Sequence, residues 1–157
     1  MGLDISLTGT GLVVLNDKLE IVRQSLITSK PIADRFNRFH GILDSIMSDV
    51  RTHQPKIVFI EGYSYNSNGG SMFDRAELGG IIKKALWDKK VKFEELAPTS
   101  LKKFITGKGN APKELMMLKV FKRFGVEFSS NDLCDAYCLA RYGYEYLVSS
   151  GVLKKDG

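Results

Sequence analysis

The chain has 157 residues, of which 43% are hydrophobic, which is enough for one ordinary core and too little for two full domains. No apolar run approaches the ~18 residues of a membrane span, and the N-terminus lacks the layout of a signal peptide, so we expect a cytoplasmic protein with a single domain over residues 1–157 and no membrane partner. The formal net charge is +5, and the presence of only two cysteines, Cys134 and Cys138, and two histidines argues against a disulfide framework or a zinc centre.

The first predicted strand carries one carboxylate. Leu3, Ile5 and Leu7 alternate with Asp4 and two hydroxyl residues before a Gly/Thr turn, so Asp4 lies on the face opposite the apolar side chains. A buried carboxylate is costly unless it is paired or bound to a cation, so Asp4 in a core strand indicates a functional residue. In an edge strand the same side chain would simply face water.

Two more strands and a helix follow in chain order. Residues 12–15 and 19–27 are expected to continue an antiparallel meander, with a turn at Asn16 and Asp17. Beyond Pro31, apolar residues recur at three- and four-residue steps and predict one apolar face of a helix from about 34 to 52, which Pro55 ends.

A second carboxylate ends the next strand. Residues 56–61 form a continuous apolar run of strand length, which is typical of a central parallel strand covered on both faces. Glu61 is the final residue of this run. Because ligand sites in open α/β sheets lie at the carboxyl ends of such strands, Glu61 is a candidate functional acid.

The remaining chain alternates helices with one strand. After a loop at 62–70 we expect a helix over 71–89, a strand over 91–96, a short helix over 98–105, a helix that Pro112 opens, and a final helix from about 129. The fold class is therefore α/β: a mixed five-stranded sheet, an antiparallel meander followed by parallel strands, flanked by helices.

The positive charge is concentrated in one segment. Residues 102–123 contain seven basic residues against the single acid Glu114, so this segment accounts for all of the net positive charge. The basic residues are Lys102, Lys103, Lys108, Lys113, Lys119, Lys122 and Arg123. A charge run is often only a solvated face, but a basic segment beside a carboxylate centre favours a polyanionic substrate.

Two more carboxylates begin the final helix. Asp132 and Asp135 are three residues apart and so project from one face, although acids also favour helix N-termini for their dipole, which accounts for Asp132 more easily than for Asp135. If this helix packs across the strands of Asp4 and Glu61, four carboxylates meet and need cations to offset their repulsion. All-oxygen ligands select Mg²⁺ or Mn²⁺, and two ions roughly 3.5–4 Å apart are the arrangement used for phosphodiester cleavage.

Four segments together resemble the RuvC-type Holliday junction resolvases in order and spacing. They are residues 2–11, 60–61, 101–113 and 131–140, and the resemblance, which spans essentially the whole chain, is to the compact phage-encoded branch. It implies an RNase H-like fold, a homodimer, and cleavage of four-way and other branched DNA with two Mg²⁺ or Mn²⁺ ions per site and no nucleotide cofactor. The family's metal-binding acids fall on Asp4, Glu61, Asp132 and Asp135, and its two important lysines fall on Lys102 and Lys113.

The loop after Glu61 departs from the family pattern. The family often places an aromatic residue three positions after the glutamate, where this chain has Ser64 between Tyr63 and Tyr65. Either tyrosine could stack on an unpaired base, worth about 1–3 kcal/mol, or both could pack against their own loop. We therefore take Tyr63, Tyr65, Lys102, Lys103, Lys108 and Lys113 as candidate DNA-binding residues, and expect a wider range of branched substrates.

Other functions share parts of this pattern. A strand aspartate before a Gly/Thr hairpin also occurs in actin-like and sugar-kinase ATPases, but those need a second lobe for which 157 residues leave no room. An RNase H-like nuclease for RNA–DNA hybrids, a transposase, or a junction-binding protein that does not cleave are the remaining alternatives. All four acids are present, which favours an enzyme.

A dimer contact is expected on the helix over 71–89. Gly79 and Gly80 cost a helix interior about 1 kcal/mol each relative to alanine, which makes sense if another element approaches closely. Met72, Phe73 and Trp87 could supply apolar area around it. The alternative is that the two glycines let the helix sit tightly on its own sheet.

Overall fold

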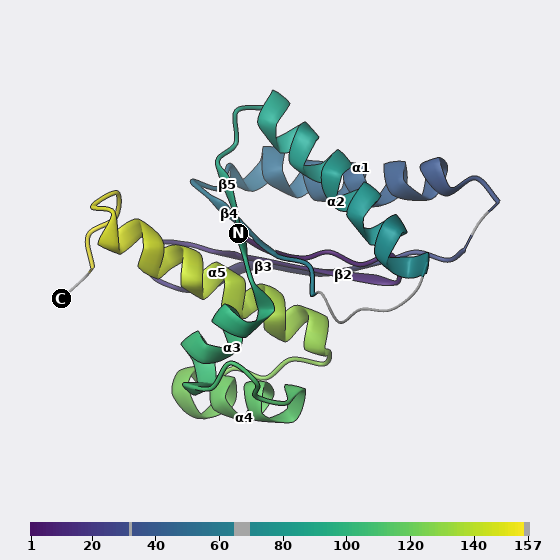
Figure 1. Ribbon diagram of the computed structural model, residues 1–157. Helices are drawn as coiled ribbons and strands as arrows, with labels where there is room; N and C mark the ends of the chain where they lie inside the picture. Colours follow the sequence, from purple (N-terminus) through teal and green to yellow (C-terminus); the bar gives the residue numbers. More distant parts are fainter. Residues whose placement is uncertain (32, 65–69, 156–157) are drawn as a thin grey trace.

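A five-stranded mixed sheet forms the centre of the computed structural model, which describes residues 1–31, 33–64 and 70–155 (Figure 1). The strands are β1 (Gly2–Asp4), β2 (Gly9–Leu15), β3 (Ile21–Thr28), β4 (Val58–Glu61) and β5 (Phe93–Leu96). Their order across the sheet is β3-β2-β1-β4-β5. The first three pair antiparallel, and β4 is parallel to both β1 and β5. The predicted sheet, a meander followed by parallel strands, is confirmed.

Helices cover both faces of this sheet. They are α1 (Arg35–His53), α2 (Gly70–Asp88), α3 (Pro98–Thr106), α4 (Lys113–Phe124) and α5 (Asn131–Ser149). Figure 1 shows α1 and α2 on one face and α5 on the other, with α3 and α4 beyond α5. None of the helices in the described residues is long and apolar enough to cross a bilayer.

Alternation along the strands divides the core into two layers. Leu3 and Leu12 point to the α1–α2 face and are fully buried there, whereas Val13 and Phe59 belong to the cluster under α5. Because side chains alternate along a strand, Asp4 and Glu61 project to the α5 face. The sheet therefore directs both acids toward the same helix.

Local sequence signals set most of the element boundaries. The Asp34 side chain caps α1 by accepting hydrogen bonds from two backbone N–H groups, and the Ser130 hydroxyl caps α5 by accepting one from Leu133. Pro112 is the N-cap of α4 and not its first residue. The second strand begins at Gly9, earlier than the expected residue 12, because the turn after β1 needs only residues 5–8.

The two cysteines lie where the sequence places them. Cys134 and Cys138 are buried on α5 as free thiols in the cluster under the sheet. The buried residues of this helix run from Leu133 to Leu147. Both cysteines therefore act as small hydrophobic residues.

Candidate active site

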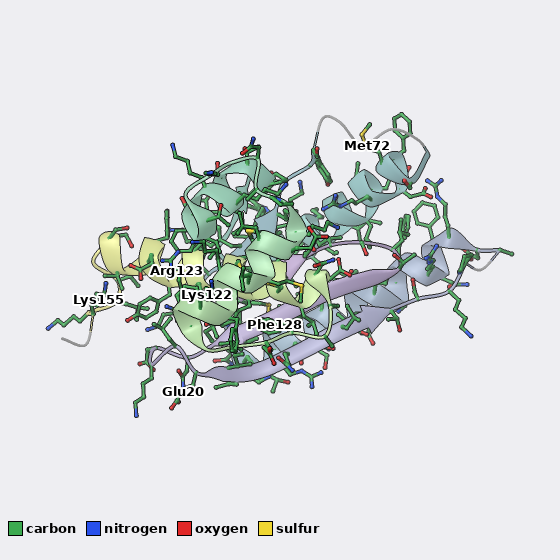
Figure 2. The ribbon with its side chains drawn as sticks, turned by 90° about the horizontal axis from the view of Figure 1, so that it is seen from below. Glu20, Met72, Lys122, Arg123, Phe128 and Lys155 are labelled. Atoms are coloured by element: carbon green, nitrogen blue, oxygen red, sulfur yellow. The ribbon has the colours of Figure 1, made fainter. Side chains whose placement is uncertain are left out.

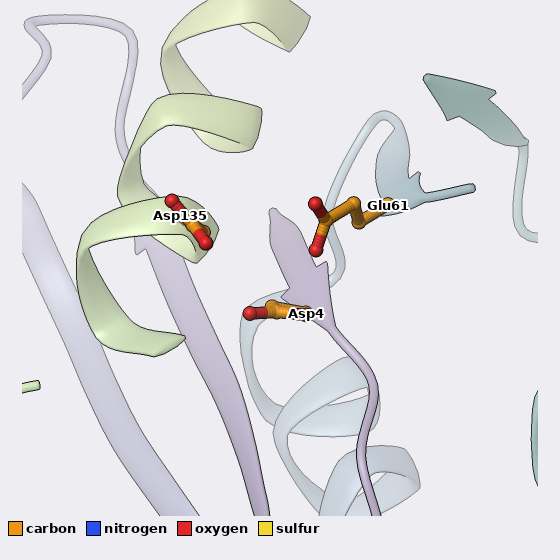
Figure 3. A group of neighbouring side chains, drawn as sticks. All are labelled: Asp4, Glu61 and Asp135. Atoms are coloured by element: carbon orange, nitrogen blue, oxygen red, sulfur yellow. The ribbon is translucent and has the colours of Figure 1, made fainter. Parts of the chain in front are cut away.

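Three carboxylates from three elements converge at the carboxyl ends of β1 and β4. Asp4 ends β1, Glu61 ends the parallel strand β4, and Asp135 lies in the second turn of α5. One carboxylate oxygen from each residue lies within 4.8 Å of those of the other two. Figure 3 shows the three side chains pointing toward a shared space from the two strands and the helix. Asp4 is only 6% exposed, so the edge-strand alternative is excluded.

Two glycines let α5 come close enough to complete the cluster. A Cβ atom at Gly11 would collide with the backbone carbonyl of Asp132, and one at Gly2 would collide with that of Ala136. Both glycines lie on the α5 face, in the strands that form the hub of the sheet. Their bare α-carbons therefore allow the helix backbone to lie directly on the strands, with Asp135 beside Asp4.

Burial and mutual repulsion dominate the electrostatics of the cluster. Burial, and then the charge of Glu61, raises the pKa of Asp4 from 3.8 to about 10. Burial and Glu61 also raise the pKa of Asp135 to about 7. Without a metal ion Asp4 therefore holds a proton at neutral pH and Asp135 is partly protonated, which is the expected response of carboxylates forced together in a partly buried site.

The fourth predicted acid lies beside the cluster and not within it. Asp132 occupies the first turn of α5, and its carboxylate lies next to Gly9 on β2. Its charge contributes to the raised pKa of both Asp4 and Asp135, so it remains electrostatically part of the site. The three-residue spacing predicted a shared face, but not that only Asp135 would join the close cluster.

Two of the predicted lysines act on the cluster. Lys113, at the start of α4, and Lys102, on α3, both lower the pKa of Asp135 against the effect of burial. They therefore lie close enough to offer positive charge at the carboxylates. Lys103 and Lys108 are exposed on the same layer.

The far end of the basic segment has a different use. Arg123 donates hydrogen bonds to the carbonyls of Phe104 and Ile105, at 3.1 and 2.9 Å, and so ties α4 to the end of α3. Figure 2 shows Lys122 and Arg123 on the α4 side of the molecule, away from Met72 at the start of α2. Part of the charge run is thus structural.

The tyrosine that follows β4 packs on α2. The Tyr63 hydroxyl donates to the carbonyl of Ala76 at 3.3 Å, and a Cβ atom at Gly79 would collide with that hydroxyl. Gly79 therefore leaves room for the Tyr63 hydroxyl within the chain, while a Cβ atom at Gly80 would meet only open space. Tyr63 remains 37% exposed, and Tyr65 lies outside the described residues.

One residue of this site gave no signal in the sequence. Arg75 on α2 donates from Nε to the carbonyl of Ile5 at 2.8 Å, directly after Asp4. Its Nη2 atom lies 3.7 Å from Asp4 Oδ1 and 3.8 Å from Glu61 Oε2. An arginine in an otherwise ordinary helix has no pattern that would mark it, and only the fold brings it to the strand ends.

The donor set fits a hard divalent cation. In the part of the chain that the structure describes, Asp4, Glu61 and Asp135 form the one group of histidine, cysteine or acidic side chains arranged to hold a metal ion. Their ligand atoms are all carboxylate oxygens, which suit the hard cations Mg²⁺, Mn²⁺ and Ca²⁺ better than softer metals. Proximity of three acids, one of them buried, gives a strong electrostatic reason to bind such an ion.

Comparison with known proteins agrees with this geometry. The chain matches the family model for crossover junction endodeoxyribonuclease RuvC over residues 1–141. The RuvC protein of Brachyspira hyodysenteriae is 29% identical over 125 residues, which cover 80% of this chain and 78% of that protein. The RuvC protein of Caldanaerobacter subterraneus subsp. tengcongensis is 28% identical over 145 residues, covering 89% and 88%.

A solved structure shares the whole architecture. RuvC from Thermus thermophilus, in complex with Holliday junction substrate, superposes with a TM-score of 0.76 over 95% of this chain and 94% of that chain, at 20% identity. The sheet and its helices therefore have the RNase H-like fold of RuvC. With the family model matching most of the sequence, the chain belongs to the RuvC family of crossover junction endodeoxyribonucleases.

Proposed function

We propose that the chain cleaves four-way DNA junctions, and other branched DNA, by metal-dependent phosphodiester hydrolysis at the carboxylate cluster. The observation that carries this proposal is the convergence of Asp4, Glu61 and Asp135 from two strands and a helix, with their oxygens within 4.8 Å, in a member of the RuvC family. A structural binding protein would have no reason to maintain three mutually repelling acids in a partly buried site.

The carboxylates would hold two divalent ions, Mg²⁺ or Mn²⁺. The charges of Glu61 and Asp132 both act on Asp4 and Asp135, which supports Asp132 as a fourth ligand. Bound ions supply an activated water and stabilise the leaving oxygen. Asp4 and Asp135 must each give up the proton that burial favours before they can act as ligands.

The basic residues near the cluster would position the DNA backbone. Lys102 and Lys113 are placed to neutralise charge at the scissile phosphate, because their influence already reaches Asp135. Lys103 and Lys108, both exposed, would contact phosphates farther along the strands. Either Tyr63 or Tyr65 would stack on an unpaired base at the junction centre. The Thermus thermophilus relative was solved with a Holliday junction substrate, which supports a branched substrate here.

A two-fold dimer would supply the second active site that paired cleavage needs. The outer side of α2 presents Phe73 at 69% exposed and Trp87 at 72% exposed, with Gly80 open between them. These three positions fall on one stripe of the helix. Two apolar side chains flanking a bare backbone are suited to an isologous helix contact.

A substrate panel tests the proposed reaction. The protein should cut a synthetic four-way junction in the presence of Mg²⁺, cut a flap more slowly, and leave plain duplex and an RNA–DNA hybrid intact. Without Mg²⁺ it should still bind the junction. Preferential cleavage of the hybrid would indicate another RNase H-like nuclease, and binding without cleavage under every metal condition would contradict an enzymatic role.

A further inference from the structure

Arg75, on α2, contacts the carboxylate cluster from the opposite side of the sheet to α5. It comes from α2, which lies on the face of the sheet opposite α5 (Figure 1). Its side chain contacts the chain directly after β1 and approaches the carboxylates of Asp4 and Glu61. Its Nε atom is fixed on the carbonyl of Ile5 at 2.8 Å. That hydrogen bond leaves Nη2 3.7 Å from Asp4 and 3.8 Å from Glu61.

A second arginine, Arg38, holds the same loop but does not pair with the carboxylates. Arg38 on α1 donates from Nη2 to the carbonyl of Leu7 at 2.9 Å and from Nε to the Ser29 hydroxyl at 2.8 Å. Arg38 and Arg75 thus hold two carbonyls of the turn that follows Asp4. In the described residues, the ion pairs of Asp4 and Glu61 are made by Arg75 and not by Arg38.

The distances decide what this guanidinium can do. At 3.7 and 3.8 Å, Nη2 is too far for a hydrogen bond to either carboxylate but close enough for a strong charge interaction. An arginine side chain carries a positive charge that an exchangeable cation must compete with. The ligand atoms of Asp4, Glu61 and Asp135 still lie within 4.8 Å of one another and can hold a cation.

We propose that Arg75 is a positioning residue that acts as a built-in counter-charge for the Asp4–Glu61 pair. It keeps the two carboxylates together before a metal ion arrives, and its charge weakens the affinity of the site for that ion. Metal occupancy of the site therefore depends on competition between the Arg75 guanidinium and the divalent ion. This inference rests on the metal-dependent function proposed above.

Metal affinity in the absence of DNA separates this role from simple anchoring of the loop. Arg75→Gln removes the charge and keeps a donor for the Ile5 carbonyl, Arg75→Met removes both, and Arg75→Lys keeps the charge. Arg38→Gln is the matched control, since it loosens the same loop without touching the carboxylates. Mn²⁺ binding is measured by calorimetry, and metal-free thermal stability by circular dichroism.

We expect Arg75→Gln and Arg75→Met to bind Mn²⁺ about tenfold more tightly than the wild type, because one repelling charge near a divalent ion is gone. Arg75→Lys and Arg38→Gln should bind as the wild type does. The neutral Arg75 variants should also melt at lower temperature without metal. If they do not fold without metal, Mn²⁺ should restore their folded spectrum, because the ion takes over the role of the counter-charge.

The opposite results would overturn the inference. Unchanged or weaker Mn²⁺ binding by both neutral Arg75 variants would reduce Arg75 to a loop anchor like Arg38, and so would neutral variants that stay unfolded when Mn²⁺ is added. In either case wild-type Mn²⁺ binding would leave the proposed nuclease function standing. A wild type that binds no Mn²⁺ would overturn the proposed function and this inference together.

Discussion

Asp4 and Gly11 face each other across the β1–β2 pair, and the bare α-carbon of Gly11 makes room for the backbone of α5 beside the acid. A Cβ atom at Gly11 would collide with the peptide carbonyl of Asp132, in the first turn of that helix. The obstacle would be backbone, which cannot rotate away as a flexible side chain can. The active site thus depends on a residue that contributes no chemical group to it.

Gly11→Ala should therefore damage the site and the fold together. The added methyl must push the start of α5 away from the sheet, which separates Asp135 from Asp4, and overpacking of this kind costs about 1–3 kcal/mol. Chemical denaturation and junction cleavage measure the two effects. Gly41→Ala on α1 is the control, because its methyl meets open space in a helix and should leave stability equal or higher. Wild-type stability and activity in Gly11→Ala would show that α5 does not need this approach.

The raised pKa values of Asp4 and Asp135 predict how metal-free stability changes with pH. Both pKa values lie above the unfolded value of 3.8, at about 10 and about 7. The stability that the protonated forms contribute is complete below the unfolded pKa and is lost as pH rises toward each folded pKa. Asp4→Asn stays neutral, so its free energy of unfolding should exceed that of the wild type. The difference should grow by at least about 1 kcal/mol between about pH 5 and pH 8.

Melting curves across this pH range, without and with Mn²⁺, check the prediction. Added Mn²⁺ should stabilise the wild type and close the gap, because the ion binds the deprotonated carboxylates. If the melting temperatures of Asp4→Asn and the wild type differ by the same amount at every pH, Asp4 is already ionised in the folded protein.

The lysines of the basic segment should divide into two groups. Lys113→Gln or Lys102→Gln should lower the cleavage rate about tenfold or more with a smaller effect on junction affinity, and should shift the pH–rate profile upward, because both lysines lower the pKa of Asp135. Single-turnover kinetics over pH measures both. A purely affinity-based loss with an unmoved profile would place these two lysines away from the reacting phosphate.

The outer lysines should affect binding instead. Lys103→Ala or Lys108→Ala should reduce the slope of log affinity against log salt by about one, as expected for one lost phosphate contact. Their cleavage rate at saturating protein should stay close to that of the wild type. Junction affinity that does not depend on salt would contradict the use of this segment as a DNA-binding face.

The dimer proposal has a matched pair of glycines for its test. Gly80 on α2 and Gly41 on α1 both face open space in the protomer, so leucine fits at either position without a clash. Gly80→Leu should sediment as a folded monomer and nick one strand per binding event, whereas Gly41→Leu should remain a dimer that makes paired cuts. If the two variants assemble alike, the contact lies on another surface.

Strand periodicity was sufficient to predict the two acids at the sheet edge. Alternation put Asp4 opposite Leu3, and an apolar run ended at Glu61, so both could be placed before any contact was known. The spacing of Asp132 and Asp135 indicated a shared helix face. It could not indicate that only Asp135 joins the close cluster, because that depends on how closely Gly2 and Gly11 let α5 pack on the strands.

Contacts between layers account for what the sequence did not predict. Arg75 and Tyr63 meet at 5.9 Å, from guanidinium to ring, although one belongs to α2 and the other follows β4. Gly79 permits that packing, which the sequence left open between a tight fit within the chain and a dimer contact. Contacts between residues that are far apart in the sequence leave no periodic pattern in it, so only the folded structure shows them.

The central claim is that Asp4, Glu61 and Asp135 hold the divalent ions that cleave a DNA junction. The most direct test measures the cleavage rate of a synthetic four-way junction against Mn²⁺ concentration for Asp4→Asn, Glu61→Gln and Asp135→Asn. Asp17→Asn, in an exposed turn, changes the net charge by the same amount and is the control. We predict that each cluster variant binds the junction but does not cut it at any Mn²⁺ concentration, while Asp17→Asn cuts as the wild type does. Cleavage without metal, or wild-type rates in any of the three cluster variants, would contradict the claim.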